Sequence, residues 1–498
     1  MLFNSYIFIL AFLPICLLGF YVIKGKKPEL AKLWLVGMSL WFYGYFNLSY
    51  LLIMLFSLAF NYCVYSLMTR NKDHKKHLLV LGIVTNLSVL FYFKYYDFFI
   101  ENCNAVFGSD IPLKGILLPL GISFFTFQQI GFLADTYRGE VENCSLLNYS
   151  LFVTFFPQLI AGPIVNQEEM LPQFKKIGQP IETQKIMRGI YIFILGMGKK
   201  VLLADTLGKC VDFAYDNLGT GINGTEAIIA ILCYTLQLYF DFSGYCDMAI
   251  GLGNMLAIDI PVNFNSPYKA VNIIDFWKRW HITLNRFFTK NIYIPLGGNR
   301  NGMAKMYRNL IIVYLISGIW HGAGWNFILW GCMHGVLYII TRAVQNVRNN
   351  SHKKNTKGES SVVDKVMHAV SVLATFVFVN IAWVFFRAPS VKAGTQMIRN
   401  VFTAGLYKPS EAFVKGFNRS ELWYVLKVAH LTNYGFSVYI LTVVTIAIAL
   451  LLVFFGKNVH ELADRTKYSV STAVMLGIVF VWSVLSLSEV GTFLYFNF

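Results

Sequence analysis

Two histidines lie within apolar sequence in the second half of the chain. His321 and His334 both belong to the segment Ser317–Gly335, which is flanked by long apolar runs. An ionisable side chain is costly at bilayer depth and is usually kept there for a function. Imidazole also titrates near neutral pH. A titratable imidazole held inside a membrane is therefore the first functional hypothesis.

The spacing of the two histidines would not bring them together on one helix. Their positions differ by 13 residues, which is a rotation of about 220° on an α-helix. Gly322-Ala323-Gly324 is expected to break the helix between them. His334 is therefore a second candidate, for which helix packing and a supporting role in a site are equally good interpretations.

A second titratable stretch, Asp275–Lys290, mixes apolar and basic residues. It predicts one amphipathic helix at the membrane interface, with an aromatic face in the headgroup layer and a basic face toward water. Electrostatic anchoring explains this pattern, and binding of an anionic donor by the basic face is the alternative. Arg279 is the donor-binding candidate here, and Asp275, Trp280 and His281 are candidates for supporting a nearby site.

Four further charged residues lie in apolar sequence. Lys199 and Lys200 either reach lipid phosphates or bind an anionic donor such as a phosphate-bearing thioester. Asp241 and Asp247 are six residues apart, a rotation of about 240°, so their carboxylates do not share a helix face. Pairing with lysine or arginine explains these aspartates at least as well as catalysis does.

The elements that carry these residues must be membrane helices. The 498 residues are 56% hydrophobic and only 14% charged, with a mean hydropathy of +0.54, whereas about a quarter of residues are charged in soluble proteins. Many apolar stretches are long enough to cross a hydrocarbon core of about 30 Å. We expect an all-α polytopic protein with about eleven spanning or partly spanning helices, because lipid cannot satisfy a strand edge.

The net charge of +16 comes from short clusters of lysine and arginine between the apolar spans. Such clusters are typical of cytoplasmic loops and do not indicate a nucleic-acid partner. Lys24–Lys32, Arg70–His77 and Arg342–Lys357 are the clearest examples, and Glu101–Lys114 is expected on the opposite side of the membrane. The eight cysteines show no CxxC spacing, so we expect neither a metal site nor a disulfide framework.

Three other stretches have an unusual composition. Phe91–Phe99 is dense in aromatic residues, and Lys94 within it is expected to snorkel from an interfacial aromatic belt. Leu118–Arg138 carries hydroxyl and amide side chains that either join helices or line a polar cavity. Phe155–Ile164 contains prolines and a glycine that should break a straight helix.

Together these motifs resemble the membrane-bound O-acyltransferase family, and in particular the branch of the alginate O-acetyltransferase membrane subunit. The resemblance depends on S-P-Y-K-A-x-x-I-x-D-F-W-K-R-W-H-I-T-L-x-R-F-F at 266–288, Y-I-P-L-G-G-N-R at 293–300 and W-H-G-x-x-W-N-F-x-x-W-G-x-x-H-G at 320–335. Weaker matches extend it over most of the chain. The second motif favours the alginate-acetylation branch over the related D-alanyl transfer branch.

The resemblance implies a catalytic histidine, which matches His321 at the W-H-G. It implies one membrane-embedded domain over 1–498, with N-terminal helices at 1–110, a core around a central funnel at 111–345 and C-terminal helices at 346–498. A cytoplasmic acyl-CoA, most simply acetyl-CoA, would be the donor substrate, with no bound cofactor. In a bacterial inner membrane, an extracytoplasmic acetyltransferase or acceptor protein would then modify an exopolysaccharide, with membrane lipids as the other partners.

In this interpretation His321 takes a proton from the acceptor hydroxyl, which attacks the thioester carbonyl. Trp320 and Asn326 are supporting candidates, the latter as an oxyanion donor. A covalent relay through Cys332 is an alternative to its role as a small core residue. The competing functions are transfer of D-alanyl or another short acyl group, transport of glycan or ions through broken helices with buried charges, and a purely structural scaffold.

Overall fold

The computed structural model of the chain describes residues 1–141, 143–351, 362–419, 421, 427–428, 430, 437–489 and 493–494. Helices are the only regular elements in this part of the chain, which confirms the predicted all-α class. A helix satisfies its backbone hydrogen bonds within one segment, as a lipid environment requires. The end of the predicted basic cluster Arg342–Lys357, from residue 352 on, lies outside the described residues.

Six of the described helices are long and apolar enough to cross a membrane. They are α3 (Leu48–Arg70), the rod Lys75–Phe107, α12 (Gly224–Met255), α16 (Trp325–Ser351, up to Val347), α17 (Val362–Arg387) and α21 (Ser437–Phe454). Phe8–Lys24 and α23 (Val470–Leu485) are shorter apolar helices. The chain is therefore a polytopic membrane protein, while the predicted number of about eleven crossings stays a prediction.

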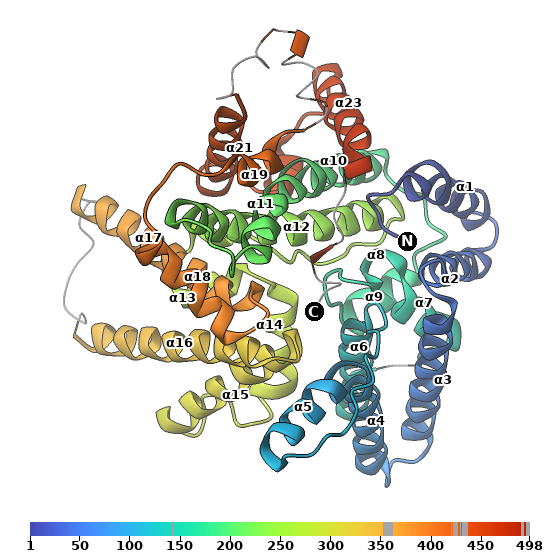
Figure 1. The fold of residues 1–498 in the computed structure, drawn as a ribbon. Coiled ribbons are helices and arrows are strands. Elements are labelled where there is room, and N and C mark those ends of the chain that lie inside the picture. Colours follow the sequence, from blue (N-terminus) through green and yellow to red (C-terminus); the bar gives the residue numbers. More distant parts are fainter. Residues whose placement is uncertain are drawn as a thin grey trace.

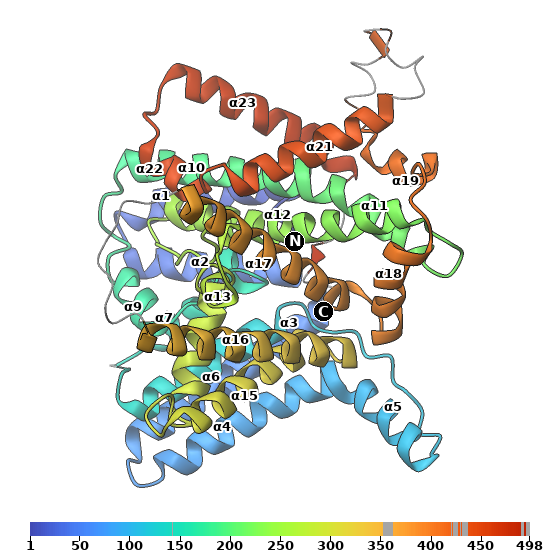
Figure 2. The same cartoon turned by 90° about the vertical axis from the view of Figure 1, so that its left-hand side faces the viewer.

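The N-terminal helices follow one another with short connections. They are η1 (Phe8–Phe12), α1 (Leu13–Lys24), α2 (Pro28–Gly44), α3 and α4 (Lys75–Leu90). α4 continues through a π-helical turn, η2 (Phe91–Tyr95), into α5 (Tyr96–Phe107). The α3–α4 loop and α5 therefore lie on opposite sides of the molecule (Figure 2). This arrangement agrees with the predicted separation of Arg70–His77 from Glu101–Lys114.

The next segment is irregular, as the sequence predicts. Its helices are α6 (Ile122–Arg138), α7 (Leu146–Thr154), the single turn α8 (Phe156–Leu159) and α9 (Gln167–Phe174). The chain leaves the helical conformation at Phe155, which confirms the break in Phe155–Ile164. Gln128 of α6 donates to the Phe152 carbonyl at 2.6 Å, and Gln129 donates to the Ser57 hydroxyl at 3.0 Å. These bonds support the packing interpretation for both amides.

α12 is a central helix of the molecule. It runs unbroken for 32 residues. In its apolar 18-residue stretch 78% of the residues are buried, against 17% in the corresponding stretch of Lys75–Phe107. α10 (Thr183–Gly198), the π-helical turn η3 (Lys199–Ala204) and α11 (Asp205–Asp216) lie along it (Figure 1). A Cβ atom on Gly196 would lie 2.7 Å from the Gly244 carbonyl oxygen, so glycine allows the close contact of α10 with α12.

α15 (Met303–His321) and α16 form a helical hairpin, and they lie side by side in both views (Figures 1 and 2). The predicted break is confirmed, because α15 ends at His321 and α16 begins at Trp325. The two backbones touch where a Cβ atom on Gly318 would lie 2.4 Å from the Phe327 carbonyl oxygen. α17 packs against α16 and leads into α18 (Val391–Thr403).

The prediction of one interfacial helix over Asp275–Lys290 is wrong. Two short helices, α13 (Ile273–Arg279) and α14 (Ile282–Phe288), replace it. Between them Trp280 is extended and His281 adopts a left-handed conformation with φ of 46°. Both side chains are buried in the protein and do not lie in a headgroup layer. The remaining elements are η4 (Pro267–Lys269), η5 (Thr289–Tyr293), α19 (Glu411–Val414), η6 (Lys415–Phe417), α22 (Val459–Arg465) and η8 (Ser486–Glu489).

Candidate active site

Three histidines from separate elements converge on two tryptophans in the protein interior. His281 precedes α14, His321 ends α15 and His334 lies within α16. The Trp320 ring contacts both His281 and His321, with ring centroids 6.2 and 4.8 Å away. The Trp330 ring contacts both His321 and His334, at 5.0 and 4.8 Å. All five side chains are buried, and we call them the histidine–tryptophan cluster.

The imidazole of His321 sits at the end of α15 among aromatic rings. Besides the two tryptophans, Phe386 of α17 lies 5.1 Å away, and all three contacts are edge-to-face. This is a favourable geometry for aromatic pairs, and it fixes the plane of the imidazole. Because only 4% of the residue is exposed, bulk water has little access to the ring. The site therefore holds an imidazole in a fixed orientation inside an apolar wall.

His334 is closer to His321 than helix rotation alone suggested. The hairpin folds α16 back along α15, so both rings contact Trp330 although they lie on different helices. His334 also packs against Trp277 at 5.2 Å and Phe378 at 5.4 Å. Among the residues that the structure describes, neither of its ring nitrogens has a hydrogen-bond partner. Buried polar groups are normally bonded, so this histidine lies in an unusual position.

The turn that holds His281 is built around Asn263. The Asn263 side-chain oxygen lies 3.2 Å from His281 Nδ1 and accepts bonds from the Thr283 backbone N–H and hydroxyl at 3.1 and 2.9 Å. The Asn263 carbonyl accepts a further bond from the Ile282 N–H at 3.0 Å. These contacts stabilise the left-handed backbone of His281. Sequence reasoning did not single out Asn263, because it acts from 18 residues upstream.

The other candidates in α13 and directly after it mainly contact one another and the core. Arg279 Nε donates to Asp275 Oδ1 at 2.9 Å, an ion pair within one turn of helix. Trp280 packs between Phe264 and Trp383, with ring centroids 5.0 Å from each. The donor-binding role of Arg279 stays a prediction, while its observed contact stabilises α13.

The expected oxyanion role of Asn326 does not fit the geometry. Its amide nitrogen donates to the carbonyls of Phe385 and Ala388, at 3.2 and 2.9 Å. Both amide hydrogens are therefore used to join the start of α16 to the end of α17. Because Phe386 lies between those two carbonyls, Asn326 holds the segment that packs on His321.

Two residues of η2 contact the end of α15 directly, and the sequence did not identify them. Lys94 Nζ donates to the carbonyls of Trp320 and His321, at 2.5 and 3.2 Å. The Tyr95 hydroxyl donates to the Ile319 carbonyl at 2.9 Å. The prediction that Lys94 snorkels to the interface is therefore wrong, because its ammonium group points into the site. Its position in an aromatic-rich segment could not reveal a partner more than two hundred residues away.

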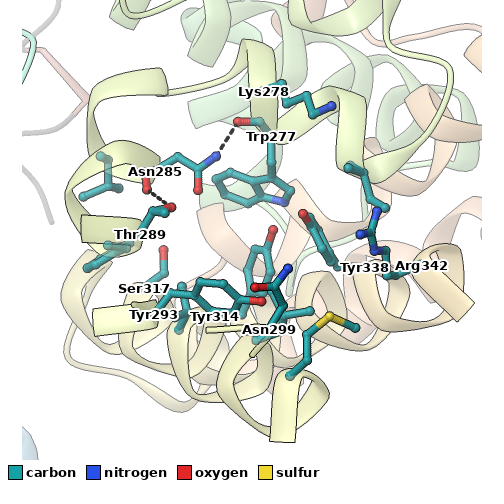
Figure 3. A pocket seen from close by; sticks show the side chains of 16 residues that line it. Trp277, Lys278, Asn285, Thr289, Tyr293, Asn299, Tyr314, Ser317, Tyr338 and Arg342 are labelled. Carbon is teal, nitrogen blue, oxygen red and sulfur yellow. Dashed lines mark hydrogen bonds between the residues drawn. The ribbon is translucent and has the colours of Figure 1, made fainter. Parts of the chain in front are cut away.

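A cavity of about 330 Å³ lies next to the cluster (Figure 3). Its walls come from α13, α14, η5, α15 and α16. The Trp277 indole separates it from His334, and Ser317 lies one helical turn before His321. The wall is fixed locally, because the Asn285 amide donates to the Trp277 carbonyl at 3.0 Å (Figure 3). The cavity thus lies beside the two histidines of the hairpin, and neither imidazole is part of its lining.

Cationic and hydroxyl side chains line this cavity in addition to the apolar residues. Lys278 is exposed and Arg342 is half-buried, and both lie on the same side of the cavity in Figure 3. Tyr293 and Tyr338 contribute phenol groups nearby. Two cations at the mouth of a partly apolar cavity suit a ligand with an anionic end. Neither cation was a named candidate, although the basic clusters around them were visible in the sequence.

The predicted donor-binding lysines 199 and 200 are instead occupied by carboxylates. Lys200 Nζ lies 2.6 Å from both Asp205 Oδ1 and Asp241 Oδ1, and Lys199 Nζ lies 2.7 Å from Asp247 Oδ2. Lys200 is only 2% exposed. The pairing that the sequence allowed for the two aspartates of α12 is thereby confirmed. Donor binding by these lysines stays a prediction, and their observed partners stabilise the core.

Comparison with known proteins identifies the family of the chain. The model of the membrane-bound O-acyltransferase family matches residues 35–384. A peptidoglycan O-acetyltransferase of Helicobacter pylori is 40% identical, over 100% of this chain and 98% of the relative. A probable alginate O-acetylase AlgI of Pseudomonas aeruginosa is 36% identical, over 85% of this chain and 78% of the relative. A teichoic acid D-alanyltransferase of Streptococcus thermophilus is 26% identical over 55% of this chain and 69% of the relative.

Proposed function

Because the chain belongs to the membrane-bound O-acyltransferase family, we propose that it moves an acetyl group from cytoplasmic acetyl-CoA to a hydroxyl group beyond the membrane. The family and the relatives named for O-acetyl transfer make the chain an O-acyltransferase. We prefer acetyl to D-alanyl because the O-acetyl relatives are more similar and match more of the chain. The observation that carries the proposal is His321 in an aromatic wall beside a cavity with a cationic mouth.

His321 is the proposed general base. Its imidazole takes the proton of the acceptor hydroxyl while that oxygen attacks the thioester carbonyl carbon. The C–O bond forms, the C–S bond breaks, and the leaving thiolate takes the proton from the imidazolium. The products are an acetyl ester and the free thiol of CoA. An acyl relay through Cys332, which is half-buried in α16, is the alternative route.

The cavity beside the cluster is the proposed donor site. Lys278 and Arg342 would contact the phosphates of CoA, and the arm that carries the thioester would extend past Trp277 and Ser317 toward His321. Charge-assisted bonds to phosphate are stronger than neutral ones, so the two cations would supply much of the donor affinity. The apolar part of the cavity suits the thioester end, which carries no charge.

For the acceptor we propose a glycan of the cell envelope. The relative named for peptidoglycan matches the whole chain at 40% identity, whereas those named for alginate match at 33% to 37%. Peptidoglycan is therefore the first acceptor to test, and an alginate-like exopolysaccharide is the second. We further propose an extracytoplasmic acetyltransferase or acceptor protein as the partner that receives the acetyl group, and a bacterial inner membrane as the location.

The test uses the purified full chain in liposomes with labelled acetyl-CoA on one side and glycan fragments on the other. The wild-type protein should transfer label to the glycan or to an added partner protein, and His321→Ala should not. Movement of glycan or ions without acyl turnover would contradict the proposal. Mass spectrometry of peptidoglycan and exopolysaccharide from a deletion strain would then distinguish the two acceptors by which one loses acetate.

A further inference from the structure

The backbone at the end of α15 is held by side chains from the π-helical turn η2. The last four carbonyls of an α-helix have no partner within the helix and must find one elsewhere. Here the Gly318 carbonyl accepts the Gly322 N–H at 3.4 Å. The following three, those of Ile319, Trp320 and His321, accept bonds from Tyr95 and Lys94. Two consecutive side chains of η2 thus satisfy the terminal carbonyls beside the proposed base.

The local geometry of η2 makes this contact possible. A π-helical turn shifts the side chains relative to a regular α-helix, and such turns are frequent at functional sites. In this turn Lys94 and Tyr95 both face α15, and the Lys94 ammonium also lies 5.8 Å from the centre of the Trp320 ring. The Ser123 hydroxyl, from α6, lies 3.5 Å from the same ammonium group. The contact therefore ties together three separate elements at the end of α15.

From these contacts we infer that Lys94 is a positioning residue for the acyl transfer reaction. It acts through His321: by fixing the carbonyls of the two peptide units on either side of the His321 Cα atom, it fixes where the imidazole side chain begins. It also supplies a positive charge to the negative end of the α15 dipole. A displacement of about 1 Å in a reacting group can lower a rate roughly 100-fold. This inference rests on the proposed role of His321 as the base.

The alternative is that Lys94 only stabilises the fold. In that case its loss would lower the thermal stability of the protein, and the active fraction that remained would turn over at the normal rate. A positioning role makes a different prediction. The turnover number would fall, whereas the Michaelis constant for the donor would hold, because Lys94 is not among the residues that line the donor cavity. Another cationic side chain at position 94 that donates hydrogen bonds should restore the rate.

The experiment compares four variants in the liposome assay. Lys94→Met keeps the length of the side chain and removes its charge and hydrogen bonds. Lys94→Arg keeps the charge and the capacity to donate hydrogen bonds. Lys114→Met is the matched control, because Lys114 is an exposed lysine of the adjoining segment that contacts the rings of Tyr92 and Tyr96. Tyr95→Phe removes one hydroxyl only, and it provides a mild variant in case Lys94→Met does not fold.

We expect Lys94→Met to lower kcat roughly 100-fold with the KM for acetyl-CoA within about twofold of wild type. Lys94→Arg should retain at least about a third of kcat, Tyr95→Phe should lose about threefold, and Lys114→Met should match wild type. Full activity in Lys94→Met, or in Tyr95→Phe if the first variant does not fold, would overturn the inference. So would failure of arginine to restore the rate of a folded protein.

A second readout does not depend on turnover. Amide hydrogen exchange over residues 316–324 reports the stability of the last turn of α15. Exchange there should become at least about tenfold faster in Lys94→Met and stay unchanged in Lys114→Met. If the wild-type chain transfers no acyl group, the proposed function fails, and the exchange rates alone decide on the contact. Unchanged exchange in Lys94→Met would then overturn the inference.

Discussion

The protein buries ionisable groups in two different ways. In the lysine–aspartate network, formed by Lys199, Lys200, Asp205, Asp241 and Asp247, each cation lies within 2.7 Å of a carboxylate oxygen. In the histidine–tryptophan cluster, three imidazoles instead pack against aromatic rings. The cluster is buried and the network is mostly buried, and each involves a π-helical turn: η3 carries Lys199 and Lys200, and η2 contacts the end of α15 beside His321. They differ in the groups that the ionisable side chains contact, which are carboxylates in the network and mainly aromatic rings in the cluster.

This difference gives the network a role in stability and the cluster a role in the reaction. A buried ion pair whose partners are close and complete holds helices together but has little capacity left to bind or react with a ligand. An imidazole against rings can exchange a proton when a substrate hydroxyl arrives. The cluster also adjoins a cavity with a cationic mouth, whereas the network lies between α12 and its covering helices. The comparison predicts that substitutions in one region affect turnover and those in the other affect stability.

The largest expected effect is on turnover and follows from His321→Ala. Loss of a general base lowers a rate by about 10²-fold to 10⁴-fold, so acetyl transfer should fall at least about 1,000-fold. Because the buried ring contacts Trp320, Trp330 and Phe386, its truncation also leaves a cavity and should lower the melting temperature, so the rate is measured per folded protein. The exposed His368 of α17 provides the control His368→Ala, which should be fully active. A His321→Ala protein with more than a tenth of the wild-type rate would show that His321 is not the general base.

The next effect is on stability and follows from Lys200→Met. This change leaves Asp205 and Asp241 buried without their shared cation, and breaking a buried pair costs about 3–5 kcal/mol. Equilibrium unfolding in detergent micelles measures the loss. For comparison, Lys185→Met removes an ion pair with the exposed Asp259, for which about 1 kcal/mol or less is expected. Equal effects of the two substitutions would show that burial of the network is not what makes it stabilising.

A smaller effect should separate donor affinity from turnover. The double variant Lys278→Ala/Arg342→Ala should raise the KM for acetyl-CoA about tenfold and leave kcat within about twofold, because it removes the proposed phosphate contacts, which lie away from the reacting atoms. Added salt should weaken donor binding to the wild type more than to the variant. Lys365→Ala, an exposed lysine at the start of α17, is the control. A fall in kcat with a constant KM would show that acetyl-CoA does not bind in this cavity.

The smallest effect is expected for His334→Phe. Phenylalanine can keep the ring contacts with Trp330 and Trp277, and the extra volume of its six-membered ring should cost about 1–3 kcal/mol of stability. We expect kcat to stay within about threefold of wild type in the liposome assay. This prediction tests whether His321 and His334 differ in their importance for turnover. A loss as large as that of His321→Ala would mean that the cluster contains two essential imidazoles.

The sequence predicted the features that depend on neighbouring residues. The glycines after His321 end α15 where expected, the prolines near Phe155 break the chain where expected, and the apolar runs become helices. The two aspartates of α12 also point to different partners, as their spacing required, because the helix is unbroken. Each of these predictions uses only backbone preferences and the helical period, which act over a few residues.

The features that the sequence did not predict depend on distant partners. His281 adopts its left-handed conformation because Asn263 holds the turn, so no local signal separated α13 from α14. Lys94 sits among aromatic residues and resembles an interfacial lysine until α15 is placed beside it. The hairpin of α15 and α16 brings His321 to Trp330, which lies one turn before His334 on α16, so one ring contacts both histidines. In each case tertiary contact, not propensity, decides the role of the residue.

The contact between η2 and α15 also has a consequence for the biogenesis of the protein. Lys94 lies 226 residues before its first acceptor, so the partner carbonyls do not yet exist when the rod Lys75–Phe107 enters the membrane. A lysine at the centre of an inserting helix costs about 2.5–3.5 kcal/mol on translocon scales. Strong apolar flanks must carry this helix into the bilayer during synthesis. Lys94 can bond to its acceptors only after the ribosome has synthesised the chain as far as His321, the proposed catalytic histidine.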